Sequence, residues 1–189
     1  MSNIRRLEDR DHYVVSMVMI TVGVWSGSGG PVKYTAESLR NSVPYWNGKP
    51  IVAYHPRIYD DGYAGNPEVF SRQRIGWVFN TAFDGNRLMA EAWIDVVRVN
   101  EVDGRIRDSI IHNKVMEVST GLAIEGEESN VEWNGSVARI LVASKLTPDH
   151  LAVLPDVRGA CSVADGAGLC RNQFVVGSVN MVQPLFPCY

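Results

Sequence analysis

The sequence predicts a mostly β protein with flanking helices, in the α+β class, built on a mostly antiparallel sheet or barrel. Runs rich in Val and Ile outnumber the amphipathic segments, and hairpin-type turns such as Asp84-Gly85-Asn86 separate them. Apolar residues make up 46% of the chain and charged residues 21%, the balance of a globular domain with its own core. We expect one domain over residues 13–163, between a charged flexible arm at 1–12 and a tail at 164–189.

The first half of the chain is expected to alternate strands with one short helix. Val and Ile dominate residues 13–25, so this segment is predicted to be a buried strand. Thr35 is of a type that caps helices, and a short helix is expected over residues 36–45. The other predicted strands of this half are residues 49–55 and the hairpin formed by 74–83 and 87–94.

The second half begins with the clearest helical pattern, over residues 95–113. Val99, Val102 and Ile106 recur at steps of three or four, which places them on one helix face. Gly104 weakens this helix, so a broken helix is an alternative. The strands predicted after it are residues 115–125, 131–145, 151–154 and 174–182.

Composition argues against several classes of partner. The formal net charge is −3, with 18 basic and 21 acidic side chains and no long basic run, so no nucleic-acid partner is expected. The longest apolar stretch is shorter than the roughly 20 residues that a membrane-spanning helix needs, so no membrane association is expected. The three cysteines are an odd number late in the chain, which favours a reducing cytosol over a disulfide framework.

Three short stretches each place a reactive side chain on or beside an apolar, strand-like run. These side chains are His55, Ser119 and His150. A serine nucleophile needs a histidine to remove its proton and a third group to hold that histidine in the correct tautomer. The three stretches therefore predict an acyl-transfer site, although each residue taken alone also has an ordinary structural role.

Strand alternation selects Ser119 over its neighbour Thr120 as the nucleophile. Ser119 shares a face with Glu117 and Gly121, whereas Thr120 shares the other face with apolar residues. Gly121 would leave space for a substrate or another backbone to approach closely. The alternative is an ordinary solvent-facing strand serine.

Two residues compete for the third position of the triad. His150 could accept a hydrogen bond from His55, and Asp149 is the rival. Alternation along a regular strand points the two to opposite faces, so only one of them is expected to face the site. The Gly159 amide, with Arg158 holding the loop or a water, is the predicted donor to the oxyanion.

Two other chemistries use some of the same residues. Lys145 could replace His55 as the base of a Ser–Lys dyad with Ser119. A metal-dependent hydrolase would instead use His55 and His150 with the acidic loop at Asp60 and Asp61, although the chain lacks the common metal-binding spacings.

At these residues the chain resembles the tailed-phage prohead maturation proteases, which are similar in fold to the herpesvirus assemblins. The resemblance covers roughly residues 14–163. It is carried, in order, by the segment that ends in His55, a hairpin, the nucleophile strand and the strand that carries the third residue. The matching segments are residues 45–56, 75–94, 117–121 and 149–154, with Arg158 at the place of an oxyanion-hole arginine.

The resemblance implies a closed or nearly closed β-barrel ringed by helices. It implies a serine endopeptidase of the Ser-His-His type that cleaves scaffold protein, capsid-protein extensions and itself through an acyl-enzyme, without any cofactor. It further implies action inside the immature capsid in the host bacterial cytoplasm, and a homodimer, because assemblins depend on dimerisation. Some phage members have an acidic third residue, which keeps Asp149 open. The alternative function is a non-catalytic virion or assembly protein on the same barrel.

Overall fold

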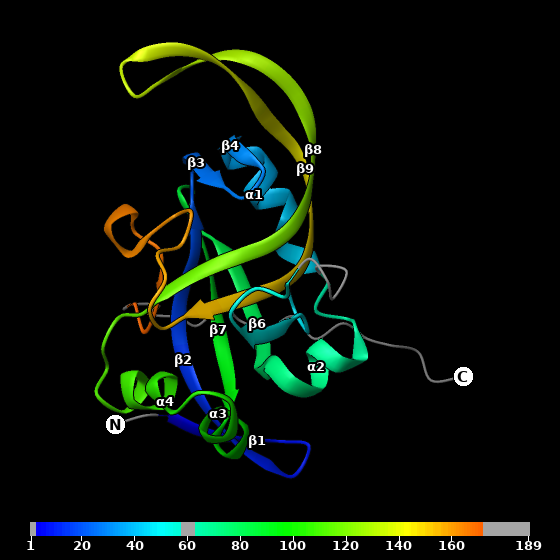
Figure 1. Ribbon diagram of the computed structural model, residues 1–189, viewed down its shortest axis with the longest axis vertical. Helices are drawn as coiled ribbons and strands as arrows, with labels where there is room; N and C mark the ends of the chain where they lie inside the picture. Colours follow the sequence, from blue (N-terminus) through cyan, green and yellow to red (C-terminus); the bar gives the residue numbers. More distant parts are fainter. Residues whose placement is uncertain (1–2, 58–62, 172–189) are drawn as a thin grey trace, which may run out of the picture.

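The computed structural model describes residues 3–57 and 63–171 and confirms the α+β class (Figure 1). The strands are β1 (Asn3–Leu7), β2 (Arg10–Thr21), β3 (Gly23–Gly27), β4 (Gly30–Tyr34), β5 (Pro50–Ala53), β6 (Arg74–Phe83), β7 (Arg87–Asp95), β8 (Glu117–Trp133), β9 (Ser136–Leu154) and β10 (Gly168–Leu169). The helices are α1 (Ala36–Ser42), α2 (Pro67–Gln73), α3 (Val96–Val102) and α4 (Gly104–Ile111), with short 3₁₀ turns at Val43–Tyr45 and Val163–Asp165.

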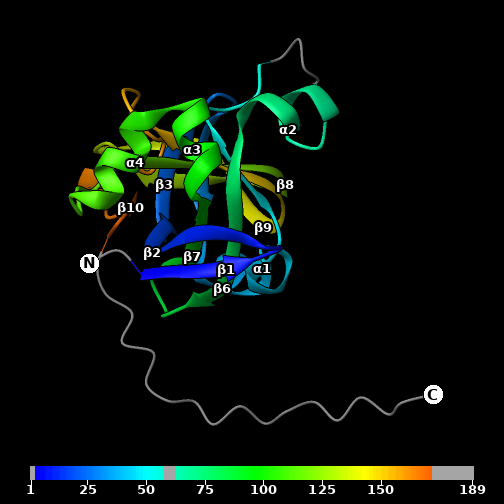
Figure 2. The same ribbon diagram turned by 90° about the horizontal axis from the view of Figure 1, so that it is seen from below.

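The strands form a single, strongly curved sheet. Its order is β1-β2-β7-β6-β5-β9-β4-β3, with β8 paired to β9 and β10 paired to β2. All ladders are antiparallel except those of β9 with β4 and with β5. This path of described strands is open, so the expected closed barrel is not confirmed. Helix α3 packs on β2, β6 and β7, α1 packs on β9, and α2 packs on β5 and β6 (Figures 1 and 2).

The predicted nucleophile strand, β8, belongs to a long hairpin that extends beyond the rest of the sheet (Figure 1). Its turn is Asn134-Gly135, and both residues have positive φ, the conformation that tight hairpin turns require. The expected strands at 131–145 and 151–154 were wrong in their bounds, because β9 runs continuously from Ser136 to Leu154. In the sequence, the segment Thr147-Pro148-Asp149 indicates the end of a strand. In the structure it remains within β9 and its pairing with β8.

Side-chain caps explain the helix boundaries. Thr35 caps α1 as predicted, with its hydroxyl accepting from the Ser38 amide. The predicted long helix is two helices, because Asp103 has an extended backbone and caps α4. Sequence analysis did not predict α2, which Asn66 caps ahead of Pro67.

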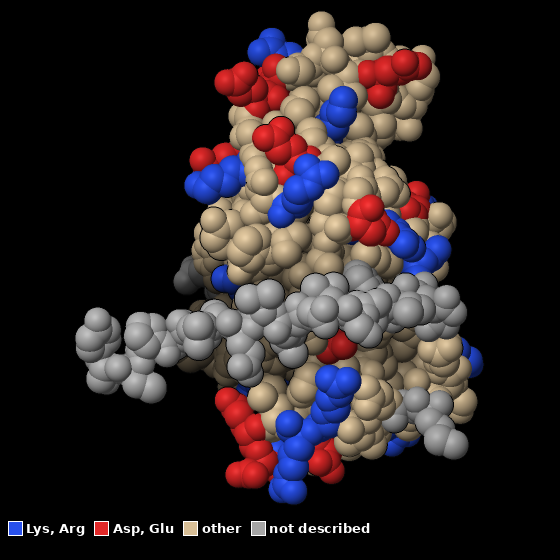
Figure 3. Space-filling model, turned by 180° about the vertical axis from the view of Figure 1, so that it is seen from behind, with Lys and Arg blue, Asp and Glu red and all other residues tan. Residues whose placement is uncertain are grey.

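The N-terminal segment differs from the expected flexible arm. Residues Asn3–Leu7 form β1, which pairs with β2 through a turn at Glu8 and Asp9, both with positive φ. The exposed, charged side chains of β1 gave no strand signal in the sequence, and one of them, Arg5, lies over the Trp93 ring. The strand expected at 174–182 lies outside the described residues. Acidic and basic side chains are interspersed over the face seen in Figure 3.

The two faces of β5, β8 and β9 have different surroundings. Ile51, Val118 and Leu151 point to the main core between the sheet and the helices. The opposite face carries a small separate cluster made by Val52, Ala64, Ala152 and Leu154. The predicted catalytic residues lie on this second face. No helix in the described ranges is long and apolar enough to cross a bilayer.

Candidate active site

Three adjacent strands bring the predicted site residues together. Ala152 of β9 lies between Val52 of β5 and Ser119 of β8, and His150 lies opposite Gly121. Because residues paired across a ladder share a face, Ser119 and His150 point to the same side of the sheet. They are diagonal neighbours there, within reach of long side chains.

Ser119 and Thr120 lie on different faces, as the alternation predicted. Thr120 is paired with Leu151, which is fully buried in the main core. Ser119 is half-buried on the opposite face. Its hydroxyl makes no hydrogen bond with the described part of the chain. The Ser119 oxygen is therefore the nucleophile candidate on this face.

A backbone reversal at Tyr54 brings His55 to His150. Ala53 lies beside Val153, so an extended continuation would carry His55 to the level of Pro155, roughly 16 Å from the level of His150. Tyr54 instead has a φ of 64°, in the left-handed region, and the chain turns back. A non-glycine residue in this region is strained by about 1–3 kcal/mol and needs support from its surroundings.

The support comes from a polar cluster around the Tyr54 hydroxyl. This hydroxyl donates to Asp156 at 2.7 Å and accepts from Arg105 at 2.8 Å. Arg105 also bonds Asp156 at 2.7 Å and Asp103 at 2.6 Å, so α4 and the segment after β9 are tied to the turn. The hydrogen bond from Arg105 lowers the pKa of Asp156 and keeps that carboxyl ionised. Sequence reasoning missed this cluster, whose members are far apart in the chain.

His55 begins a hydrogen-bonded relay of three side chains. Its Nδ1 lies 2.8 Å from Nε2 of His150, and Nδ1 of His150 lies 2.6 Å from Oδ2 of Asp149. That same carboxylate oxygen accepts from the Ala64 amide at 2.9 Å. A carboxylate only accepts, so His150 must donate through Nδ1 and accept through Nε2. His55 must then donate through Nδ1, which leaves its Nε2 with a free lone pair.

Electrostatics keep both imidazoles neutral. Burial lowers the pKa of His150, and Asp149 opposes this effect without reversing it. Burial, followed by the positive charge that His150 would carry, lowers the pKa of His55. His55 nevertheless keeps an edge exposed to solvent. A neutral, accessible imidazole with an open Nε2 is the form that acts as a general base.

The expectation that His150 and Asp149 point to opposite faces was wrong. Gly121 is opposite His150 but Leu122 is opposite Pro148, so Asp149 is the extra residue of a β-bulge. A bulge interrupts alternation and allows Asp149 to bond its neighbour. His150 thus contacts His55 directly, and Asp149 bonds the other nitrogen of the His150 ring.

The space above Gly121 is filled by the protein itself. A Cβ atom at this position would lie 2.1 Å from Cε1 of His150, so the imidazole lies directly over the glycine. The expectation that Gly121 admits a substrate was therefore wrong. The missing side chain makes room for the relay.

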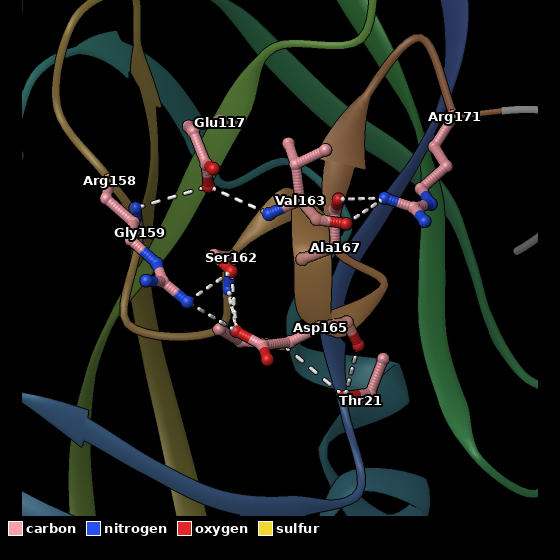
Figure 4. A network of polar contacts seen from close by, with 10 residues as sticks. Thr21, Glu117, Arg158, Gly159, Ser162, Val163, Asp165, Ala167 and Arg171 are labelled. Carbon is pink, nitrogen blue, oxygen red and sulfur yellow. Dashed lines mark hydrogen bonds and ion pairs between the residues drawn. The ribbon is translucent and has the colours of Figure 1, made fainter.

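The predicted oxyanion donor Gly159 lies against the nucleophile strand (Figure 4). A Cβ atom there would lie 2.2 Å from the Val118 carbonyl oxygen, so only glycine allows this approach. Its amide is already engaged, because it donates to Oε2 of Glu117 at 3.2 Å. The Val163 amide donates to the same oxygen at 3.0 Å. Sequence reasoning assigned no role to Glu117.

Arg158, the other predicted oxyanion residue, holds the loop through Ser162 and Asp165 (Figure 4). Its Nη2 donates to the Ser162 hydroxyl at 3.1 Å and lies 3.6 Å from Asp165. Its side chain is 72% exposed. Arg158 therefore matches the predicted loop-holding role.

The two alternative chemistries fare differently. The Ser119–Lys145 dyad was wrong, because Lys145 pairs with Glu125 on the exposed hairpin, away from Ser119. For the metal site, Asp60 and Asp61 lie outside the described residues. Within 3–57 and 63–171, no group of three or more His, Cys, Asp or Glu side chains has a metal-binding arrangement.

Comparisons with known protein families, with curated proteins and with solved structures each give no match. The resemblance to prohead proteases therefore stays a prediction that these comparisons do not test.

Proposed function

We propose that the protein is a serine endopeptidase with Ser119 as nucleophile, His55 as general base and His150 as the third residue. One observation carries the proposal: the relay from Asp149 through His150 leaves Nε2 of His55 unprotonated on the face that holds Ser119.

The proposed reaction follows from these positions. His55 Nε2 takes the proton of the Ser119 hydroxyl as the oxygen attacks the peptide carbonyl. The protonated His55 then gives this proton to the leaving amine, and an acyl-enzyme remains. Water, deprotonated by His55, hydrolyses the ester and restores Ser119. His150 stabilises the transient imidazolium without carrying a full negative charge, and Asp149 holds His150 in place.

The resemblance supplies the biological setting of this proposal. The substrates would be the scaffold and capsid proteins of a tailed phage, cleaved inside the immature capsid, and the enzyme would cleave itself. The fold would be an assemblin-like barrel. A homodimer belongs to the same proposal.

A fluorophosphonate probe tests the nucleophile directly, because it reacts with activated serines. Wild-type protein should be labelled at Ser119, as read by peptide mass spectrometry, and should cleave an unfolded protein such as casein. Ser119→Ala should abolish both signals. Ser129→Ala removes an exposed serine further along β8 and is the matched control. Absence of labelling in the wild-type protein would reject the proposal.

A non-catalytic assembly protein is the second candidate, favoured by the engagement of the Gly159 amide with Glu117. It predicts that wild-type protein and Ser119→Ala behave alike toward the probe and toward casein. The same experiment therefore separates the two functions.

A further inference from the structure

A groove of about 780 Å³ lies at the start of β8 and the end of β9, and the candidate nucleophile lies just outside its lining. Its floor includes Glu117 and Leu154, which are paired across the ladder. Ser119 and Ala152 form the next pair on the same face, roughly 7 Å further along the strands. This distance corresponds to two residues of an extended peptide, so a peptide whose scissile carbonyl lies at Ser119 would enter the groove about two residues earlier.

The relay lies on the other side of Ser119. His150 is opposite Gly121, two residues from Ser119 in the direction away from Glu117. In the proposed reaction the leaving amine must receive its proton from His55, and His55 is bonded to His150. The leaving portion of the peptide therefore lies toward the relay, and the acyl portion lies toward the groove.

Apolar side chains share the lining of the groove with charged ones, among them Lys114. Val115 and Val157 are 44% and 51% exposed, and exposed apolar side chains that lie together mark interaction sites, whereas single ones do not. Several charged groups at the groove are neutralised within the protein: Arg105 pairs with Asp156, and Arg158 pairs with Asp165. The apolar lining residues are Val115, Met116, Leu154, Pro155, Val157 and Val163.

We propose that this groove binds the acyl side of an extended peptide and selects a Leu, Ile, Met or Val side chain at the second or third position before the scissile bond. The inference rests on the proposed protease function. It adds a substrate class that neither the relay nor the fold specifies. An apolar side chain gains contact with the exposed valines, whereas a charged one would lose water against them.

Cleavage-site profiling tests the proposal. Wild-type protein is incubated with a peptide library made by digestion of a bacterial proteome, and new termini are identified by mass spectrometry. We expect enrichment of Leu, Ile, Met and Val at the second or third position before the new cleavage site. Enrichment confined to the positions after the cleavage site would overturn the assignment of the groove.

Rim substitutions connect the preference to the groove. Val115→Asp and Val157→Asp introduce charge at exposed positions, so both variants should fold. We expect kcat/KM for the best library peptide to fall about tenfold or more, the effect of losing an apolar contact in a specificity pocket. Fluorophosphonate labelling of Ser119 should stay within about twofold of wild type, because the small probe does not need the groove. Val137→Asp, 71% exposed on the distant hairpin, is the control.

The outcomes distinguish failure of the protease function from failure of the groove as the substrate site. Wild-type protein without Ser119 labelling would reject the protease function itself. Labelled protein that shows no apolar preference, or that cleaves peptides equally well after Val157→Asp, would reject the groove as the substrate site while leaving the protease function in place.

Discussion

Nδ1 of His55 lies 2.8 Å from Nε2 of His150, and this contact determines which nitrogen of His55 keeps a free lone pair. Asp149 forces His150 to donate through its Nδ1, so His150 can only accept from His55. In the proposed reaction, this contact would orient the base before a substrate binds. Preorganisation of this kind lowers the cost of reaching a transition state.

Replacing His150 tests the relay. His150→Ala should slow fluorophosphonate labelling of Ser119 by about 100-fold, because the tautomer and orientation of His55 are no longer fixed. Asp149→Asn should have a smaller effect, since it acts through His150. The measurement is the second-order labelling rate, with circular dichroism to verify folding. A rate in His150→Ala equal to that of wild type would exclude the relay from catalysis.

The lowered pKa of His55 predicts the pH profile. The unprotonated base should persist below the ordinary histidine pKa of about 6.5. The labelling rate should therefore stay level from pH 8 to below pH 6 and decline only in more acidic buffer. A midpoint at or above pH 7 would contradict a base with a lowered pKa.

The same shift predicts how stability depends on pH. His55 and His150 bind protons more weakly in the folded protein than in the unfolded chain. Stability from these neutral imidazoles is fully present above pH 6.5 and is lost as pH falls, because the unfolded chain then binds more protons. Melting temperature should drop between pH 7 and pH 5, and the drop should be smaller in a His55→Gln, His150→Gln double variant.

Gly121 should tolerate no side chain. Gly121→Ala places a Cβ atom 2.1 Å from the His150 ring, so the imidazole must move. We expect a loss of about 1–3 kcal/mol in the free energy of unfolding, measured by urea denaturation, together with loss of labelling. Gly29→Ala meets no atom within 4 Å and should leave both unchanged.

Glu117 is predicted to restrain the oxyanion donor. Its carboxylate accepts from the Gly159 amide, which the tetrahedral intermediate would need. Glu117→Gln weakens a charge-assisted hydrogen bond to a neutral one, so the labelling rate should rise severalfold. If Glu117 instead holds the loop in its productive position, the rate will fall, and the sign of the change decides between these roles.

Local signals were sufficient for part of the fold. Thr35 caps its helix through atoms three residues away, and Asn134-Gly135 turns its hairpin because both residues adopt positive φ at low cost. Arg5 shows the opposite case. Its exposed, charged strand was predicted to be a flexible arm, because its partners, β2 and the Trp93 ring beneath Arg5, are not visible in the local sequence.

The sequence by itself determined the α+β class, most element positions, and the choice of His55, Ser119 and His150 as candidates, because apolar alternation is visible locally. Only the tertiary structure decided how these residues relate. The reversal at Tyr54, the bulge at Asp149 and the contact of Glu117 with Gly159 depend on strands that meet across long sequence separations. Such contacts form when burial of the shared core holds the strands in register, and no local pattern encodes them.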